Sequence, residues 1–319
     1  MINLNQLRVF YEAAKYQNFT VAANRLFVTQ PAITAQVKSF ENQCNLKLFK
    51  RKGRKIFLTD EGKALFECVK RIFECEKEIE DLVEEMREMK RGILRLGTTK
   101  AYARYFMPFL ISSFREAYPH IKVHLDEGSS QDMVRSLVEL RNEVAVIAKV
   151  EDNPEIAFTP FSQEELVLIV APDHELAQKK NVCMDDLAAE PIIMKELGSG
   201  TRKQVNDLFG KSRLVPNVLV ETSNTEFIKQ LVQRGDGISF VVREAVTAEL
   251  NERKLAAVPV EGEQMCLDVS IAHLKNQTLS RPAHAFVQML RKISKEQEDQ
   301  GIRKILDEYL TKWQQAGQQ

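Results

Sequence analysis

The feature that most constrains the fold is the stretch 20–58, close to the N-terminus. Thr20 can cap a short helix over residues 21–27, where apolar side chains recur at helical spacing. Pro31 suits the first turn of a second helix, because its φ is fixed and it has no N–H to leave unsatisfied. This second helix carries an apolar stripe at Ile33, Val37, Phe40 and Cys44. Two short helices joined by a tight turn predict a helix-turn-helix, in which the second helix enters a DNA major groove.

Small and polar side chains occupy the outward side of the second helix, and basic side chains follow it. We expect contacts with the major groove from Thr29, Gln30, Pro31, Ala32, Thr34 and Lys38. Residues 50–55 then place five positive charges around one glycine, and residues 56–58 favour a short strand. This pattern predicts a basic hairpin, or wing, in which Arg51 and Arg54 reach phosphates or the minor groove.

Positive charge is concentrated at this end of a neutral chain. Residues 1–55 hold ten Lys and Arg against two Asp and Glu. The whole chain has 45 of each, which leaves 35 basic against 43 acidic residues in the remainder. A solvated charge run beside an ordinary helical hairpin is the alternative interpretation. Together with the helix-turn-helix pattern, however, the asymmetry favours nucleic acid as the partner.

The same residues carry a family resemblance that runs nearly unbroken over residues 4–62. The matching motifs are Phe19-Thr20-x-Ala22-Ala23-x-x-Leu26, Thr29-Gln30-Pro31-Ala32-Ile33-Thr34, Phe40-Glu41 and Leu46-x-Leu48-Phe49-x-Arg51. They resemble the N-terminal signature of LysR-type transcriptional regulators. Thr29 stands where the family commonly has serine, which keeps a capping hydroxyl. Asn45 replaces a common glycine, and Asn tolerates the left-handed conformation expected there.

The resemblance implies an α/β protein with an all-α-type winged helix-turn-helix N-terminal domain, a long linker helix and a two-lobed, periplasmic-binding-protein-like effector domain. The expected boundaries are 1–59 for the DNA-binding domain, 60–91 for the linker, 92–161 plus 267–294 for lobe I, and 162–266 for lobe II. Residues 295–319 form a C-terminal extension, where Ile302, Ile305 and Trp313 fall on one predicted helical face. The resemblance also implies a dimer of dimers, and it makes RNA polymerase a candidate partner.

A continuous helical pattern follows the wing and runs to about Arg91. Thr59 offers a cap, and no Gly or Pro interrupts the pattern after Gly62. Spacings of four and three alternate along Leu65, Val69, Ile72, Ile79, Val83 and Met86. This period is a coiled-coil signal and predicts pairing with a second subunit. A helix lying on its own effector domain is the alternative.

The chain from residue 92 onwards alternates continuous apolar strands with amphipathic helices. This order predicts a parallel, doubly wound sheet, and its recurrence predicts two lobes. From the resemblance we expect the chain to cross between lobes near Phe161 and again near Leu267.

Polar residues follow strands at three places where a ligand is expected. They supply the candidate effector-binding residues Thr98, Thr99, Lys100, Ser129, Ser130, Thr201 and Arg202. Hydroxyls, free amides and two cations around one cleft suit a small anion. The stretch Thr98-Thr99-x-x-x-Ala103-Arg104-Tyr105, with Pro108, resembles the cysteine-biosynthesis branch of the family, whose members sense sulfate or acylated serine.

The sequence gives little support for catalysis, a cofactor or a metal. The five histidines lack metal-ligand spacing, and nucleophile, P-loop and dinucleotide motifs are missing. With neither a membrane span nor a signal peptide in the sequence, we expect a cytoplasmic protein. The five cysteines form no C-x-x-C pair, and Cys68 and Cys75 are interpreted as packing residues, with a redox switch as the alternative.

The leading hypothesis is a DNA-binding regulator controlled by a small anion. The rivals are a cytoplasmic α/β enzyme or a solute-binding protein with an appended DNA-binding domain, and a nonspecific nucleoid binder.

Overall fold

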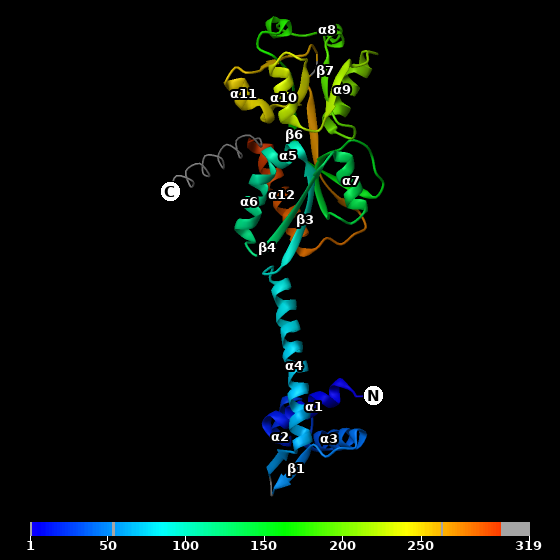
Figure 1. Ribbon diagram of the computed structural model, residues 1–319, viewed down its shortest axis with the longest axis vertical. Helices are drawn as coiled ribbons and strands as arrows, with labels where there is room; N and C mark the ends of the chain where they lie inside the picture. Colours follow the sequence, from blue (N-terminus) through cyan, green and yellow to red (C-terminus); the bar gives the residue numbers. More distant parts are fainter. Residues whose placement is uncertain (1, 53–54, 263, 301–319) are drawn as a thin grey trace, which may run out of the picture. The chain divides into compact units, whose positions relative to one another are not determined.

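The computed structural model describes residues 2–52, 55–262 and 264–300 (Figure 1). The chain divides into two compact units, Met1–Met86 and Arg87–Gln319. Arg54, and the predicted helical face of the C-terminal extension from Ile302 to Trp313, lie outside the described residues.

The first unit is a small helical domain with a two-stranded hairpin. Its elements are α1 (Leu4–Tyr16), α2 (Phe19–Arg25), α3 (Gln30–Cys44), β1 (Phe49–Lys52), β2 (Lys55–Leu58) and the start of α4 (Asp60–Arg87). The stripe of α3 packs inward as predicted, with Ile33, Val37 and Phe40 buried. β1 and β2 pair antiparallel and form the predicted wing.

Local backbone chemistry explains the boundaries of these helices. The cap of α2 is Asn18, not Thr20: the Asn18 side chain accepts hydrogen bonds from the amides of Thr20 and Val21. An Asn at this position satisfies two amides at once, and the helix therefore starts earlier than predicted. Asn45 ends α3 with φ of 51°, which confirms the expected left-handed residue. Thr29 is the N-cap of α3, but its side chain makes no capping hydrogen bond.

The linker helix α4 begins as predicted, because Thr59 Oγ1 accepts from the Gly62 amide at 3.0 Å. It ends at Arg87, four residues earlier than expected, and Met89 follows with φ of 59°. Leu65 and Val69 pack into the core of the first unit, where Val69 is 1% exposed. Val69 is therefore not available for dimerisation, because its own chain already covers it, whereas Leu65 is half-buried and stays a predicted dimerisation residue. Exposed apolar side chains along the rest of the stripe are Ile72, Ile79, Val83 and Met86.

The second unit contains a mixed sheet rather than the purely parallel one that the sequence predicted. β3 (Gly92–Thr99) pairs parallel with both β4 (Ile121–Gly128) and β5 (Val144–Ala148). β11 (Cys266–Leu274) lies antiparallel between β5 and the long β6 (Ile156–Val170). β9 (Ser239–Val242) and β10 (Ala256–Val258) also pair antiparallel with β6. β7 (Ile192–Lys195) and β8 (Val218–Thr222) form a parallel pair. The prediction failed because hydrophobic runs reveal burial on both faces but not strand direction.

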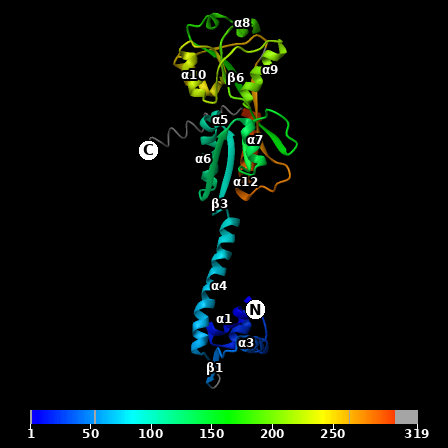
Figure 2. The ribbon, with the colours of Figure 1, turned by 45° about the vertical axis from the view of Figure 1, so that its right-hand side comes forward.

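Two lobes arise because β6 and β11 extend through both (Figure 2). The first half of β6 pairs with β11, and its last residues pair with β9 and β10. Each lobe has its own apolar core, and Leu267 packs against both. The helices around lobe I are α5 (Lys100–Tyr105), α6 (Met107–Ala117), α7 (Ser130–Val138) and α12 (Arg281–Gln300). Those of lobe II are η1 (Glu175–Gln178), α8 (Met184–Ala189), α9 (Gly200–Lys211), α10 (Thr225–Gln233), η2 (Arg243–Val246) and α11 (Thr247–Asn251).

Candidate DNA interface and effector cavity

The predicted DNA-contacting residues lie on one side of α3 and its N-terminal turn. Thr29, Gln30, Pro31 and Lys38 are exposed, and Ala32 and Thr34 are half-buried. Gln30 Nε2 donates to Thr34 Oγ1 at 2.9 Å, and that hydroxyl donates to the Gln30 carbonyl at 3.1 Å. This pair orders the Gln30 amide at the surface, where it can present hydrogen-bonding groups to a base edge.

The wing is fixed to α3 by a buried carboxylate that sequence reasoning did not single out. Glu41 Oε1 accepts hydrogen bonds from the amides of Leu48 at 2.8 Å and Phe49 at 3.1 Å. Lys47 Nζ lies 3.5 Å from the other oxygen of this carboxylate. Arg51, on the wing, lies over the Phe19 ring with its Cζ 5.8 Å from the ring centroid. The signal for Glu41 was its place in the motif Phe40-Glu41, next to a buried aromatic residue.

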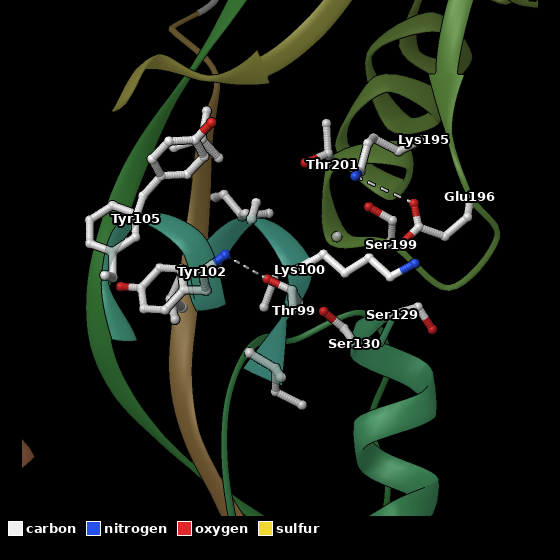
Figure 3. A pocket seen from close by; sticks show the side chains of 18 residues that line it. Thr99, Lys100, Tyr102, Tyr105, Ser129, Ser130, Lys195, Glu196, Ser199 and Thr201 are labelled. Atoms are coloured by element: carbon white, nitrogen blue, oxygen red, sulfur yellow. Dashed lines mark hydrogen bonds and ion pairs between the residues drawn. The ribbon is translucent and has the colours of Figure 1, made fainter. Parts of the chain in front are cut away.

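A small cavity lies within the second unit where the two lobes meet (Figure 3). Its volume is about 40 Å³, room for roughly three water molecules. Five of the predicted effector residues line it: Thr99, Lys100, Ser129, Ser130 and Thr201. They come from the N-terminal turns of α5, α7 and α9, which meet at this cavity.

The structure does not bring Thr98 and Arg202 to this cavity. Thr98 Oγ1 donates to the Val146 carbonyl at 2.8 Å inside the sheet. The Arg202 guanidinium donates to the Lys195 carbonyl at 3.1 Å and lies 2.5 Å from the Glu221 carboxylate. Both residues follow the expected elements, but Thr98 Oγ1 and Arg202 Nη1 are already bonded to neighbouring strands, while Arg202 Nε is buried without a hydrogen-bond partner among the described residues.

The hydroxyls of Ser129 and Ser130 have different roles at the start of α7. Ser129 Oγ accepts from the Asp132 amide at 3.1 Å and donates to the Asp132 carboxylate at 2.7 Å. These hydrogen bonds lower the pKa of Asp132 and complete a capping box. Ser130 is 1% exposed, and its Oγ has no hydrogen-bond partner among the described residues. A buried hydroxyl without a partner is costly, and the cavity is the place where a ligand could supply one.

Lys195 is the principal cavity residue that sequence reasoning missed. It is 8% exposed, and its Nζ donates to the Ser223 carbonyl at 2.7 Å and lies 3.5 Å from the Glu196 carboxylate. Burial lowers its pKa, and the Glu196 carboxylate opposes that shift. Lys195 ends a strand of apolar residues, so the rule that located Thr99 and Ser129 could have found it. Ser199, the N-cap of α9, lies in the polar stretch 198–202 at the predicted start of this helix and also lines the cavity.

Direct contacts hold the lobes together around this cavity. The Gln131 amide donates to the Gly198 carbonyl at 3.2 Å, and Lys100 Nζ donates to Ser223 Oγ at 2.6 Å. On α5, Tyr105 donates to the Glu226 carboxylate of lobe II at 2.8 Å. The described state is therefore one in which the two lobes are in contact.

Among the described residues, no group of three or more His, Cys, Asp or Glu is placed to hold a metal ion. Among the helices of this part of the chain, none is both long and apolar enough to cross a membrane.

Comparisons with known proteins match both parts of the chain. Residues 4–63 match the pattern described as "Bacterial regulatory helix-turn-helix protein, lysR family", and residues 87–294 match the "LysR substrate binding domain". The chain is 34% identical over 287 residues to the HTH-type transcriptional activator CmpR of Synechocystis sp., covering 90% of this chain and 94% of that protein. It is 30% identical over 285 residues to the RuBisCO operon transcriptional regulator of Allochromatium vinosum, covering 89% and 94%.

A solved structure extends the comparison to the second unit. The regulatory domain of CcmR from Synechocystis PCC6803, in complex with 2-PG, matches with a TM-score of 0.60 and 28% identity. The match covers 64% of this chain and 98% of that domain. The names of these relatives do not support the more specific resemblance to the cysteine-biosynthesis branch. The two matched domains and the 34% identity to a LysR-type relative show that this chain belongs to the LysR family of DNA-binding transcriptional regulators.

Proposed function

We propose that this regulator senses a small anion in the cavity between its lobes and reads its operator through α3 and the wing. The observation that carries the proposal is the buried Ser130 hydroxyl, which lines the cavity without a hydrogen-bond partner among the described residues. An anion there would accept from the hydroxyls of Ser130 and Thr201 and from the first amides of α9. Because each helix N-terminus also carries partial positive charge, the cavity favours a negative ligand.

The complex of the CcmR regulatory domain with 2-PG supports an anionic effector by analogy. Sulfate and acylated serine are further candidate effectors, because the stretch 98–108 resembles the cysteine-biosynthesis branch. Binding would change the relation between the lobes, and a coupling of about 1–3 kcal/mol to DNA binding is typical.

The effector proposal is tested by calorimetric titration of the full chain with 2-PG, sulfate, inorganic phosphate and O-acetylserine. At least one should bind, and Ser130→Ala should weaken that ligand about tenfold, since a hydrogen bond to a charged group is lost. Ser112→Ala, an exposed serine on α6, is the control and should bind as the unaltered protein does. Equal affinity in Ser130→Ala, or binding by none of the four anions, would count against the proposed site.

DNA recognition is tested with the DNA upstream of the gene for this protein. A footprint over several helical turns, absent from scrambled DNA and weakening steeply with salt, is expected. Equally weak binding to both DNAs would contradict specific recognition at that site.

We further propose that two subunits pair through the exposed stripe Ile72, Ile79, Val83 and Met86. An open groove of about 720 Å³ adjoins this stripe between α1 and α4, and Leu4, Phe73 and Ile79 are among its lining residues. Pairing of effector domains would extend the dimer to a homotetramer in the cytoplasm, with RNA polymerase as a candidate partner. Sedimentation should show a smaller species for Ile79→Glu, because a charge would be buried in the interface. An unchanged mass would contradict this interface.

A further inference from the structure

An exposed aromatic residue with a strained backbone stands directly before the recognition helix α3. Phe27 is 96% exposed, the largest value among the exposed large apolar side chains of the described residues. Its φ of 54° lies in the left-handed region, where a bulky residue is uncommon. A ring left in water and a strained backbone both cost free energy in the free protein.

The turn after α2 explains the backbone of this residue but not its side chain. The Phe27 amide donates to the Asn24 carbonyl at 3.4 Å, and the Val28 amide donates to the Ala23 carbonyl at 3.0 Å. These two hydrogen bonds form a Schellman motif, which ends a helix with a left-handed residue and favours glycine or asparagine there. Asn45 meets that preference at the end of α3. The turn gains nothing from a phenyl ring, so the reason for the ring is a contact outside this chain.

Continuity with the predicted base contacts indicates that DNA makes this contact. Residues 27–31 form one unbroken exposed run, which includes Gln30. The N-terminal residues of a recognition helix lie against base edges in the major groove. Phe27 stands two residues before Thr29, the N-cap of α3, and therefore enters the groove beside them. The excess of basic over acidic side chains in residues 1–55 also favours DNA as the partner.

The chemistry of the ring decides which group of the DNA it can bind. A phenyl ring has no hydrogen-bonding atom, so a phosphate or a polar base edge would lose water against it without compensation. Base edges in the major groove carry one apolar group, the C5-methyl of thymine, and phenylalanine is among the residues that can cover it. Removing both apolar surfaces from water is favourable.

We infer that Phe27 reads a thymine of the operator by covering its C5-methyl group in the major groove, close to the base that Gln30 reads. This inference rests on the proposed DNA-reading role of α3 and adds a specificity-determining residue to it. The exposed ring and the strained backbone are retained in the free protein because their costs are recovered only on the operator.

The test is a double-mutant cycle between the phenyl ring and the methyl group. The full chain is titrated with the DNA upstream of its gene or, if that DNA is not bound specifically, with a site that the protein selects from genomic fragments. Thymines are replaced one at a time by deoxyuridine, which keeps the base pair and lacks the methyl group. One replacement should weaken binding about fourfold, the value for one buried methyl group. Phe27→Ala should weaken binding to the unaltered site at least as much, and the two losses should not add, because both remove the same contact.

Three further variants control this experiment. Phe227→Ala removes another exposed phenyl ring, on α10 of lobe II, and should keep the full response to deoxyuridine. Phe27→Leu keeps an apolar side chain and should retain part of that response. Phe27→Gly removes the ring and relieves the strained φ, so its loss of affinity cannot come from a destabilised turn. Thermal unfolding would verify that each variant is folded.

The outcomes separate this inference from the proposed function. Losses that add, or deoxyuridine without effect at every position, would overturn the contact with thymine. If Gln30→Ala relaxes specificity while Phe27→Ala and Phe27→Gly bind as the unaltered protein does, this inference fails and the DNA-reading role of α3 stands. If neither Gln30→Ala nor the Phe27 variants change operator binding, both proposals fail.

Discussion

The proposed DNA-reading surface and the effector cavity gather their polar residues in opposite ways. On the DNA side, the predicted contacts from Thr29 to Lys38 lie within one helix and its N-terminal turn. In the cavity, Lys100 meets Ser223 across 123 positions of sequence. The DNA-reading surface needs only α3, with an apolar stripe on the side of the helix that faces the core. The effector cavity exists only when two lobes are folded and in contact, so substitutions should affect the two regions differently.

The largest expected effect on the DNA-reading surface follows from removing Gln30. Gln30→Ala should cost about 1–3 kcal/mol in operator affinity, because an ordered amide that can read a base edge is lost. Effector binding and thermal stability should not change, since Gln30 is exposed. Competition binding with operator and scrambled DNA measures the effect, with Asn42→Ala at the other end of α3 as the control. A loss shared equally by both DNAs would show that Gln30 carries no sequence information.

In the effector domain, Gly200 is the position where a single methyl group should matter most. A Cβ there would lie 2.4 Å from Ala148 Cβ and 2.8 Å from Leu267 Cδ1, which presses lobe II against lobe I. We expect Gly200→Ala to lower the free energy of unfolding by about 2 kcal/mol through overpacking. Gly210→Ala, in the same helix, meets nothing within 4 Å and should be neutral or stabilising by up to about 1 kcal/mol. Urea unfolding of both variants makes the comparison. Equal stabilities would mean that the lobe contact at Gly200 is not closed in solution.

Phe27 offers a stabilising change beside the DNA-reading helix. It is 96% exposed and has φ of 54°, a conformation that costs energy for a residue with a Cβ. Phe27→Gly should therefore raise the local opening free energy of α2 and α3 by up to about 1 kcal/mol, since no burial is lost. Hydrogen exchange of these amides in the full chain gives the value. Arg25→Gly, within α2, should have the opposite sign. If Phe27→Gly speeds exchange, the aromatic ring has a structural role in the turn.

The smallest effect concerns a buried carboxylate where the lobes join. Glu164 is 3% exposed, and its Oε1 accepts from Tyr102 at 2.9 Å and from Ser162 at 2.6 Å. Burial raises the pKa of Glu164 above its ordinary value of 4.5. The folded state thus holds this proton more tightly than the unfolded state. The resulting stability is present below 4.5 and is lost as pH rises through the folded pKa.

Glu164→Gln keeps the accepting oxygen and removes the charge. Its melting temperature should exceed that of the unaltered protein at pH 7, and the difference should shrink as pH falls towards 4.5. Thermal unfolding across this range checks the sign. A difference that does not vary with pH would show that Glu164 keeps the same protonation in both states.

Sequence patterns were most reliable where the relevant contacts are local. The stripe of Ile33, Val37 and Phe40 predicted which side of α3 is buried, and Asn45 predicted where the helix ends. The coiled-coil pattern of α4 was right about the helix but did not show that Val69 belongs to the core of its own domain. An apolar stripe on a helix indicates that its residues are buried, but it does not indicate whether the same chain or a second subunit covers them.

The sequence by itself determined the helix-turn-helix, the wing and the two-lobed architecture, and it predicted five of the residues that line the cavity. These depend on helical and strand periodicity and on the rule that ligands gather after strands. Only the tertiary structure decided the direction of the strands and the position of Thr98 and Arg202 outside the cavity. It also decided that Lys100 and Lys195 both bind Ser223. Those features depend on which distant groups satisfy each polar atom, and pairing between distant segments leaves no periodic signal in the chain.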